Sequence, residues 1–378
     1  MYGGRVIDEF DRRIIRTYMD EYVGEFLFDK FQPYHFYCDT SVDYLIPDEG
    51  DRDSYLNAIE ELPLVNGPEV CGLHPNAEIG YYTQAAKELW DRLLELQPQR
   101  GGPGGGVSRD NFVDNVAKDI LVRIPPPYDV ARTRKTYEMN ITPTIIVLLQ
   151  ELERFNLLLE QMRQTLNLLR KAALAGEIGS DTLLDNMADS LFNSQLPHAW
   201  KKLAPVTCKS LGPWMDHFER RIQQYTLWAA SGDPMVMWLS GLHVPESFLT
   251  ALVQSVCRKN GWPLDKTTLC TTVTTYMDVD DGCLVHGLYL EGAHWDKQRQ
   301  CLVRSHPRVL IEELPMLLII PIEVHRRKLQ NTFRTPVYIT SRRRDARGAG
   351  LVFQVDLATK EHESHWILQG VCLVLNTD

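Results

Sequence analysis

The sequence lacks a glycine-rich phosphate loop, because no Gly-x-x-x-x-Gly-Lys-[Ser/Thr] run occurs in its 378 residues. Without that loop the protein has no backbone cradle and no lysine for the β- and γ-phosphates of ATP. No acidic run follows an apolar strand in the manner of a Walker B motif either. We therefore expect that this segment alone holds no ATP or magnesium and hydrolyses no ATP.

Positive charge is also in deficit, with 40 Lys and Arg against 50 Asp and Glu and a net charge of −10. Nucleic-acid binding needs a surplus of cations, so this class of partner is disfavoured. No apolar run is long enough to span a membrane, and the densest one, Met316–Ile322, predicts a buried strand interrupted by Pro321. The first residues do not resemble a signal peptide. We expect neither nucleic acid nor a membrane as a partner.

Metal-binding patterns are sparse. The eight cysteines include no CxxC pair, so we expect reduced, mostly buried thiols in a cytosolic or ciliary compartment. The run from Asp278 to Gly282 resembles the start of a calcium loop, but Tyr289 stands where the bidentate glutamate is required, which favours a hairpin turn. Glu291, His294 and Asp296 could form a metal or general-base site; we favour hydrogen bonding within a turn.

What is present indicates a globular protein, since 44% of the residues are apolar and the length suits two or three domains. Apolar residues recur at helical spacing through most of the first 260 positions. The helices expected from this spacing cover residues 8–31, a short segment at 55–59, 76–96, 109–123, 143–174, 181–193, 211–230 and 245–259.

The longest expected helix, residues 143–174, carries a heptad-like apolar stripe. The stripe consists of Ile145, Leu149, Leu152, Phe155, Leu159, Met162, Leu166 and Leu169. One interpretation is a coiled-coil seam, which would make this protein a freestanding adaptor that dimerises through the helix. The other is a bundle helix facing the core, which we favour because the stripe is short and lacks clean charge pairing at its edges.

After about residue 264 the apolar period changes from 3.6 to 2. The expected strands cover residues 267–277, 284–290, 351–357 and 366–373, separated by turns rich in Gly, Asp and Pro. Helices first and strands last predict an α+β protein with an N-terminal helical part and a C-terminal antiparallel, barrel-like sheet.

Five motifs in a fixed order are more specific than these patterns. They are Tyr2-Gly3-Gly4-Arg5 followed by Asp8, Asp11, Arg12 and Arg13; the run from Gly72 to Gly80; the run from His286 to Ala293 with Trp295 and Asp296; Thr335–Tyr338; and His365–Val371. Together they resemble the C-terminal region of dynein heavy chains. The ending, with the run from Leu329 to Arg334 before it, is most similar to an axonemal inner-arm heavy chain, the beta heavy chain of the two-headed arm.

The resemblance implies three parts. Residues 1–62 would end the sixth AAA+ module, 63–263 would form the helical part of the dynein C-terminal domain, and 264–378 its β-barrel part. The segment would bridge one face of the AAA+ ring and modulate motility, while ATP and magnesium bind elsewhere in the parent motor. Its implied partners are the rest of the ring and, through the parent, intermediate chains, light chains and axonemal microtubules of a cilium or flagellum.

Interface candidates come from charge and from these motifs. Residues 1–60 hold 14 acids and 6 bases, whereas residues 321–350 hold 8 bases and 2 acids. The basic loops suit docking onto an acidic surface, or simple protection of a strand edge. Arg5 could reach a phosphate, but pairing with Asp8 or Asp11 is the commoner outcome. The candidates are Arg5, Asp8, Arg12, Arg13, Trp295, Arg326, Arg327, Lys328, Arg342, Arg343 and Arg344.

The competing function is a freestanding enzyme built on Glu291, His294 and Asp296.

Overall fold

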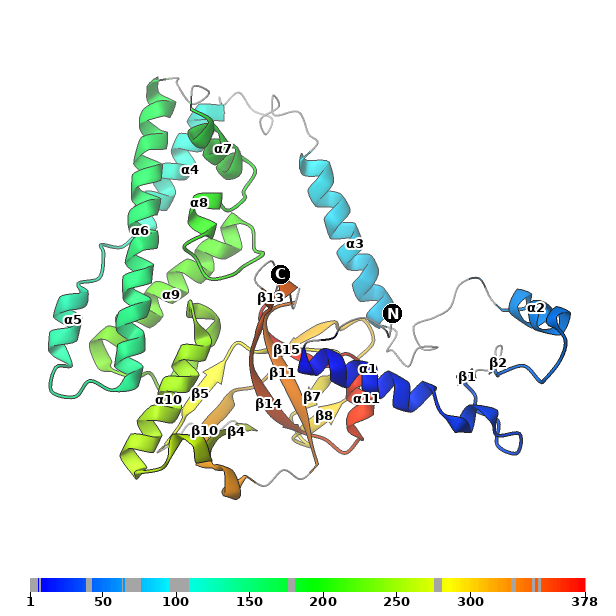
Figure 1. Cartoon of the computed structure of the whole chain (residues 1–378). Helices are drawn as coiled ribbons and strands as arrows, with labels where there is room; N and C mark the ends of the chain where they lie inside the picture. Colours follow the sequence, from blue (N-terminus) through cyan, green and yellow to red (C-terminus); the bar gives the residue numbers. More distant parts are fainter. Residues whose placement is uncertain are drawn as a thin grey trace.

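The computed structural model describes residues 6, 8–38, 43–62, 64, 76–95, 109–175, 181–274, 281–327, 331–341, 344–345 and 348–377. Helices fill the first two thirds of the sequence and strands the last third, so the α+β class is confirmed (Figure 1). The described helices are α1 (Glu9–Tyr22), α2 (Arg52–Glu60), α3 (Asn76–Glu95), α4 (Arg109–Arg123), α5 (Val130–Thr136), α6 (Pro143–Ala175), α7 (Thr182–Phe192), α8 (His198–Lys201), α9 (Leu211–Ser231), α10 (Pro245–Asn260) and α11 (Glu363–Leu368).

Local sequence explains where the helices begin and end. Asp8 caps α1 by accepting hydrogen bonds from the backbone N–H groups of Phe10 (2.9 Å) and Asp11 (3.1 Å). The helix ends at Tyr22, so the prediction of a helix to residue 31 was wrong at its end. Gly24 follows, and the backbone turns through the short 3-10 helix η1 (Glu25–Phe28). Glycine favours helix termination because it has no side chain to restrict the backbone.

The helical bundle is organised by α6, against which α4, α7, α9 and α10 pack. Every residue of the predicted apolar stripe is buried within this protein. The bundle interpretation is therefore confirmed, and the dimerisation seam is excluded because its side chains are already covered. Helix α5 was not predicted, since Val130–Thr136 carries no apolar periodicity. None of the helices in the described residues is long and apolar enough to cross a membrane.

Two main sheets form the β-rich part. The first has the order β3-β5-β10-β4 and the second the order β14-β11-β15-β6-β9. Their strands are β3 (Val236–Trp238), β4 (Thr267–Val273), β5 (Cys283–His286), β6 (Tyr289–Glu291), β9 (Ile311–Glu313), β10 (Leu317–Glu323), β11 (Thr332–Thr340), β14 (Leu351–Ala358) and β15 (Cys372–Asn376). Smaller pairs join β1 (Tyr37–Cys38) to β2 (Asp43–Tyr44), β7 (His294–Asp296) to β8 (Cys301–Val303), and β12 (Arg344–Asp345) to β13 (Gly348–Ala349).

The sheets differ from the predicted antiparallel barrel in two ways. Strands β3 and β5 pair in parallel, as do β11 and β15, while the other pairs are antiparallel. No strand pairing among the described residues closes the two sheets into one barrel. They meet instead where the backbone N–H of Asp356 on β14 donates to the Thr271 hydroxyl on β4 at 2.9 Å. The result is two sheets that share one core.

Two predicted strands were wrong in detail. Residues 284–290 divide at Gly287 into β5 and β6, which belong to different sheets. Residues 366–373 divide into helix α11 and strand β15, because His362 caps the helix and Gly370, with φ of +68°, lets the backbone reverse. Trp366 and Ile367 are buried on the helix. A short apolar run cannot distinguish a buried helix from a strand by periodicity.

The cysteine expectation is confirmed for most of the described thiols. Cys257, Cys283, Cys301 and Cys372 are buried, and Cys208 is exposed. Burial raises the pKa of the Cys283 thiol to about 12, so this side chain stays protonated at neutral pH and acts as a small apolar group.

Candidate functional site

The first N-terminal helix is held on the second sheet by Arg13. Its guanidinium lies 4.7 Å from the ring centre of Phe10 and 4.9 Å from that of Phe333 on β11. Phe10 and Arg13 are three residues apart on α1 and therefore share a face. The Arg13 Nη1 donates to the backbone oxygen of Arg334 at 2.7 Å. We call this arrangement the arginine clasp.

The cation of the arginine clasp lies in a partly buried, partly apolar setting. Burial lowers the pKa of Arg13, and the nearby charge of Glu363 on α11 opposes that shift. Helix α1 packs along α11, which brings this carboxylate close. A cation over an aromatic face is attracted by about 0.5–2 kcal/mol, and more when water is excluded. The arginine clasp therefore stabilises one placement of α1 on the sheet.

The neighbouring motif residues shape the start of α1. The Arg12 Nε donates to the backbone oxygen of Val6 at 2.9 Å, and Asp8 caps the helix as described. Both side chains thus have roles inside this protein. Arg5 lies outside the described residues, so its pairing with Asp8 or Asp11 stays a prediction.

Asn76 makes a second connection to the β-rich part. Its Nδ2 donates to the backbone oxygens of His306 and Val309, both at 2.9 Å. Its Oδ1 accepts from the backbone N–H of Arg308 at 2.8 Å. Arg308 has φ of +68°, a left-handed conformation that a non-glycine residue adopts at a cost of about 1 kcal/mol or more. We call this arrangement the asparagine clasp; its loop follows β8 and precedes β9.

The basic candidates are divided between internal and exposed roles. Arg327 forms an ion pair with Asp356, and both side chains are largely buried. Arg326 is exposed, pairs with Glu323 at 3.2 Å and lies 5.5 Å from the ring centre of Trp262. Lys328, Arg342 and Arg343 lie outside the described residues, as does the side chain of Arg344.

Trp295 contributes to the hydrophobic core. Its side chain is 4% exposed on β7, and its indole Nε1 has no hydrogen-bond partner among the described residues. Any effect of Trp295 on an interface would thus act through the β7–β8 hairpin that it supports. The buried ring itself presents no surface to a partner.

The three residues of the competing catalytic set contact three different parts of the protein. Asp296 accepts from the backbone N–H groups of Gln298 (2.8 Å) and Arg299 (3.0 Å), which confirms the predicted turn hydrogen bonding for this residue. The prediction was wrong for the other two: His294 Nδ1 contacts the carboxylate of Glu312 on β9, and Glu291 accepts from the Cys372 thiol on β15 at 3.7 Å. Across the described parts of the protein, no group of three or more His, Cys, Asp or Glu side chains is arranged to hold a metal ion.

Sequence reasoning missed the environment of Trp238, which explains the His286-Gly287-Leu288 motif. A Cβ on Gly287 would lie 2.9 Å from the Trp238 ring, and Gly287 also has φ of +74°. Arg220 lies 4.5 Å from the centre of that ring, and the ring of His217 lies 5.0 Å away. The motif thus marks a position where the backbone approaches an indole, which only glycine permits.

His217 should make folding stability depend on pH. Burial, assisted by the charges of Lys209, Arg221 and Arg220 and opposed by Asp216, lowers its pKa from 6.5 to about 4. Because the folded pKa is the lower one, the folded state binds this proton more weakly than the unfolded state. The contribution of neutral His217 to the free energy of unfolding is fully present above pH 6.5 and is lost as the pH falls toward 4.

We therefore expect His217→Gln to flatten the decline of the free energy of unfolding between pH 6.5 and 4. Urea unfolding at a series of pH values measures this decline. His198→Gln, at an exposed histidine, is the matched control and should leave the decline unchanged. Identical curves for wild type and His217→Gln would contradict the assignment.

Comparison with known proteins places both clasps across one boundary. Residues 1–77 match the family model of the AAA lid domain of dynein heavy chains, and residues 83–375 match the family model of their C-terminal domain. Arg13 and Asn76 lie in the first match, whereas Phe333, Arg334 and the 306–309 loop lie in the second.

Individual relatives agree with these models. The sequence is 58% identical over 385 residues to Dynein axonemal heavy chain 10 of Homo sapiens, covering 100% of this protein and 9% of that one. It is 53% identical over 385 residues to the Dynein-1-alpha heavy chain of the flagellar inner arm I1 complex of Chlamydomonas reinhardtii, covering 100% and 8%. The Dynein-1-beta heavy chain of that complex is 33% identical over 385 residues, covering 99% and 8%.

The inner-arm resemblance is confirmed, but the higher identity to the alpha heavy chain does not favour the expected beta heavy chain. The 378 residues span less than a tenth of the length of these relatives.

Proposed function

Because this chain belongs to the dynein heavy chain family, we propose that it is a C-terminal part of a microtubule motor and links an AAA+ lid mechanically to the C-terminal domain. The observation that carries the proposal is the pair of clasps across the boundary between the two matched regions. A movement of the lid must carry the second sheet with it or break these contacts.

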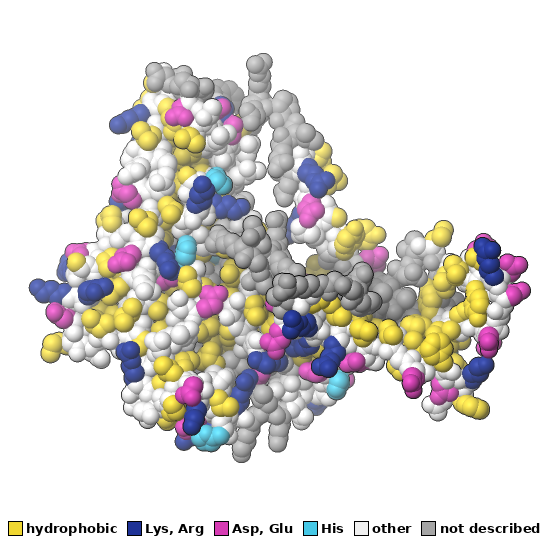
Figure 2. Space-filling model, viewed as in Figure 1, with side chains coloured by type: hydrophobic (Ala, Val, Ile, Leu, Met, Phe, Trp, Pro, Cys, Tyr) yellow, Lys and Arg dark blue, Asp and Glu magenta, His cyan; other side chains and the backbone are white. Residues whose placement is uncertain are grey.

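The exposed apolar surface of the N-terminal part supports a place within a larger assembly. Figure 2 shows hydrophobic side chains gathered over the region of α1, η1 and α2. The exposed large apolar side chains of this N-terminal part include Phe28, Phe31, Ile59 and Leu64, of which Phe31 is 98% exposed. Exposed apolar patches of this kind normally mark an interface. The natural cover is the upstream part of the sixth AAA+ module.

Helix α3 points to the same assembly. Its apolar residues Ile79, Tyr82, Leu89, Trp90 and Leu93 follow helical spacing along one face, and all but the first are well exposed. A helix that leaves such a face in water gains little stability from packing. We infer that the AAA+ ring covers this face in the parent motor.

ATP hydrolysis in this proposal takes place elsewhere in the parent. The sequence holds no phosphate loop, so ATP and magnesium would bind upstream, and this segment would alter how the ring responds. It can do so only if it contacts two states of the ring with different free energy. The exposed Arg326 and the basic residues around it would then dock onto acidic surfaces of the ring or of a neighbouring subunit.

The relatives' names suggest the setting. The two most similar of the relatives described above are an axonemal heavy chain and a flagellar inner-arm heavy chain, by their names. We therefore place the parent in the axoneme of a cilium or flagellum, acting on microtubules, with intermediate and light chains as its assembly partners.

The clasps can be tested in the parent motor by the double substitution Arg13→Ala with Asn76→Ala. Coupling free energies between sites are about 1–3 kcal/mol, so loss of the smallest still changes an equilibrium about fivefold. We expect a several-fold change in microtubule-stimulated ATPase or gliding velocity, with ATP binding intact. Both are measured on the purified motor.

Arg16→Ala supplies the matched control, because Arg16 is exposed on the same helix. It should leave ATPase and gliding unchanged. Limited proteolysis of the 378-residue protein tests the contact itself: the double variant should separate the lid-matched region from the C-terminal region more readily. If proteolysis changes and motility does not, the clasps are only structural, and the mechanical proposal is wrong.

A further inference from the structure

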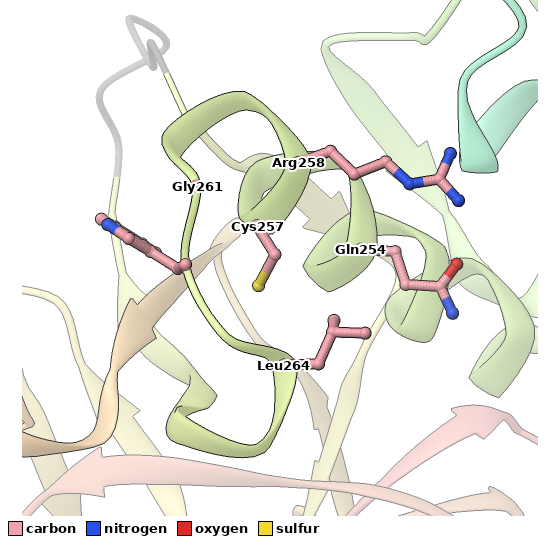
Figure 3. A pocket seen from close by; sticks show the side chains of 6 residues that line it. Gln254, Cys257, Arg258, Gly261 and Leu264 are labelled. Carbon is pink, nitrogen blue, oxygen red and sulfur yellow. The ribbon is translucent and has the colours of Figure 1, made fainter.

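A pocket of about 340 Å³ lies outside the clasps, where α10 ends against the 3-10 helix η5 (Leu264–Lys266). Helix α10 ends at Asn260, and the φ of +69° at the next residue, Gly261, lets the backbone turn back beneath the helix. In Figure 3 the side chain of Cys257 points into the hollow enclosed by this turn, and Leu264 approaches it from below. Cys257 is buried and its Sγ donates to the Thr267 hydroxyl at 3.3 Å. The pocket therefore has a fixed, largely apolar floor.

An exposed apolar surface continues from this pocket. Strands β4 and β10 pair with Thr267 opposite Glu323, so η5 and the 3-10 helix η6 (Val324–Arg326) lie side by side at the end of the first sheet. Leu264 is 55% exposed on η5 and Val324 is 53% exposed on η6. Trp262 adds an aromatic wall to the pocket. We call the surface made by Arg258, Trp262, Leu264, Val324 and Arg326 the α10 platform.

Three cations and two acids border the α10 platform. Arg258 lines the pocket, Arg326 lies over Trp262, and Lys266 ends η5. The acids are Asp265, between Leu264 and Lys266, and Glu323, which Arg326 neutralises. No described carboxylate lies within ion-pair distance of Arg258 or Lys266, whereas Arg326 pairs with Glu323. Figure 3 shows Gln254 and Arg258 extending side by side from successive turns of α10. An amide beside a guanidinium presents several N–H donors to a carboxylate.

We propose that the α10 platform binds an acidic segment of a separate protein. An apolar side chain of that segment fills the pocket against Cys257 and Leu264, and its carboxylates pair with Arg258 and Lys266. A protein segment fits better than a small molecule because the pocket is open to solvent and the apolar surface extends beyond it. This site is separate from the lid contacts, so the proposal does not depend on the mechanical function above.

The test uses the purified 378-residue protein and fluorescein-labelled peptides in which one central Leu, Ile, Met or Phe is flanked by glutamates. Fluorescence anisotropy measures their affinity at low and moderate salt. We expect binding that weakens with salt, and a loss of affinity of about tenfold or more in Arg258→Glu, where a cation is replaced by a repelling charge. Leu264→Ser should weaken binding as well, because it removes the apolar wall of the pocket.

Matched controls lie on distant helices. Arg134→Glu on α5 and Leu183→Ser on α7 alter an exposed cation and an exposed leucine, and should bind the peptides like the wild type. A peptide with a central serine should bind more weakly, and one with lysines in place of glutamates should not bind. Absence of binding by every acidic peptide, or equal affinity of Arg258→Glu and Arg134→Glu, would overturn the proposal. So would self-association of the protein by light scattering that Arg258→Glu abolishes, because the occupant would then be a second copy.

Discussion

Replacing Glu151 by alanine is expected to lower the free energy of unfolding of this protein by about 3–5 kcal/mol, as when one partner of a buried charge network is removed. Glu151 lies in the middle of α6 and is 1% exposed. Its carboxylate accepts from the Tyr225 hydroxyl (2.7 Å) and from the backbone N–H groups of His243 (2.7 Å) and Val244 (3.1 Å). One side chain thus joins α6, α9 and the segment before α10.

The loss is large because the groups that remain are buried. Burial lowers the pKa of Arg221, and the negative charge of Glu151 opposes this shift. Arg221 donates to the backbone oxygen of Gly241 at 2.7 Å, while its Nη1 already has no hydrogen-bond partner among the described residues. Removing Glu151 takes away the anion beside this cation and an acceptor of the Tyr225 hydroxyl. An unsatisfied buried polar group costs about 1–3 kcal/mol.

Urea unfolding followed by tryptophan fluorescence measures the effect of Glu151→Ala. Glu151→Gln should lower the free energy of unfolding by less than Glu151→Ala does, because the amide oxygen still accepts hydrogen bonds. Glu153→Ala, at an exposed position of the same helix, is the control and should change stability by less than about 0.5 kcal/mol. A Glu151→Ala variant as stable as the Glu153→Ala variant would contradict the role of this network.

A second large effect is expected for Gly292→Ala, which should destabilise the protein by about 3 kcal/mol or more. Gly292 has φ of +79°, and a Cβ there would lie 2.6 Å from the backbone oxygen of Gln369 and 3.2 Å from Val371. The left-handed backbone and the forced displacement of neighbouring atoms each cost about 1–3 kcal/mol. Both neighbours are backbone atoms between α11 and β15, so no side-chain rotation relieves the clash.

Gly80→Ala offers a control of opposite sign. Gly80 lies inside α3, and a Cβ there meets nothing within 4 Å. Alanine is favoured over glycine in a helix by about 0.5–1 kcal/mol, so this variant should be slightly more stable or unchanged. Circular dichroism during thermal unfolding compares the two variants. Equal melting temperatures for Gly292→Ala and the wild type would show that the backbone between Gln369 and Val371 gives way easily.

The sequence predicted the long helices because each repeats its apolar spacing over many turns. The stripe on α6 is the clearest case, since its residues recur every three or four positions and all are buried. The strands were predicted less well. Parallel pairing of β11 with β15 joins segments that are distant in the sequence, and no local pattern encodes that choice. Helix α11 was missed because six residues are too few for a periodicity.

The candidate site was predicted in part. The charged motif residues Asp8, Arg12 and Arg13 could be singled out, but their partners could not, because Arg13 contacts a backbone oxygen 321 positions later. Asn76 begins a helix that was expected, but the partners of its side chain lie more than 200 positions away. A carbonyl or an N–H carries no identity in the sequence, so contacts of this kind become visible only in the fold.

The clasps also determine how a pull on the lid-matched region is resisted. Arg13 and Asn76 fasten two segments of that region, distant from each other in the sequence, to the β-rich part. A pull on α1 loads the arginine clasp and a pull on the start of α3 loads the asparagine clasp, so release of one leaves the other in place. Detachment of the whole region therefore requires both clasps to break.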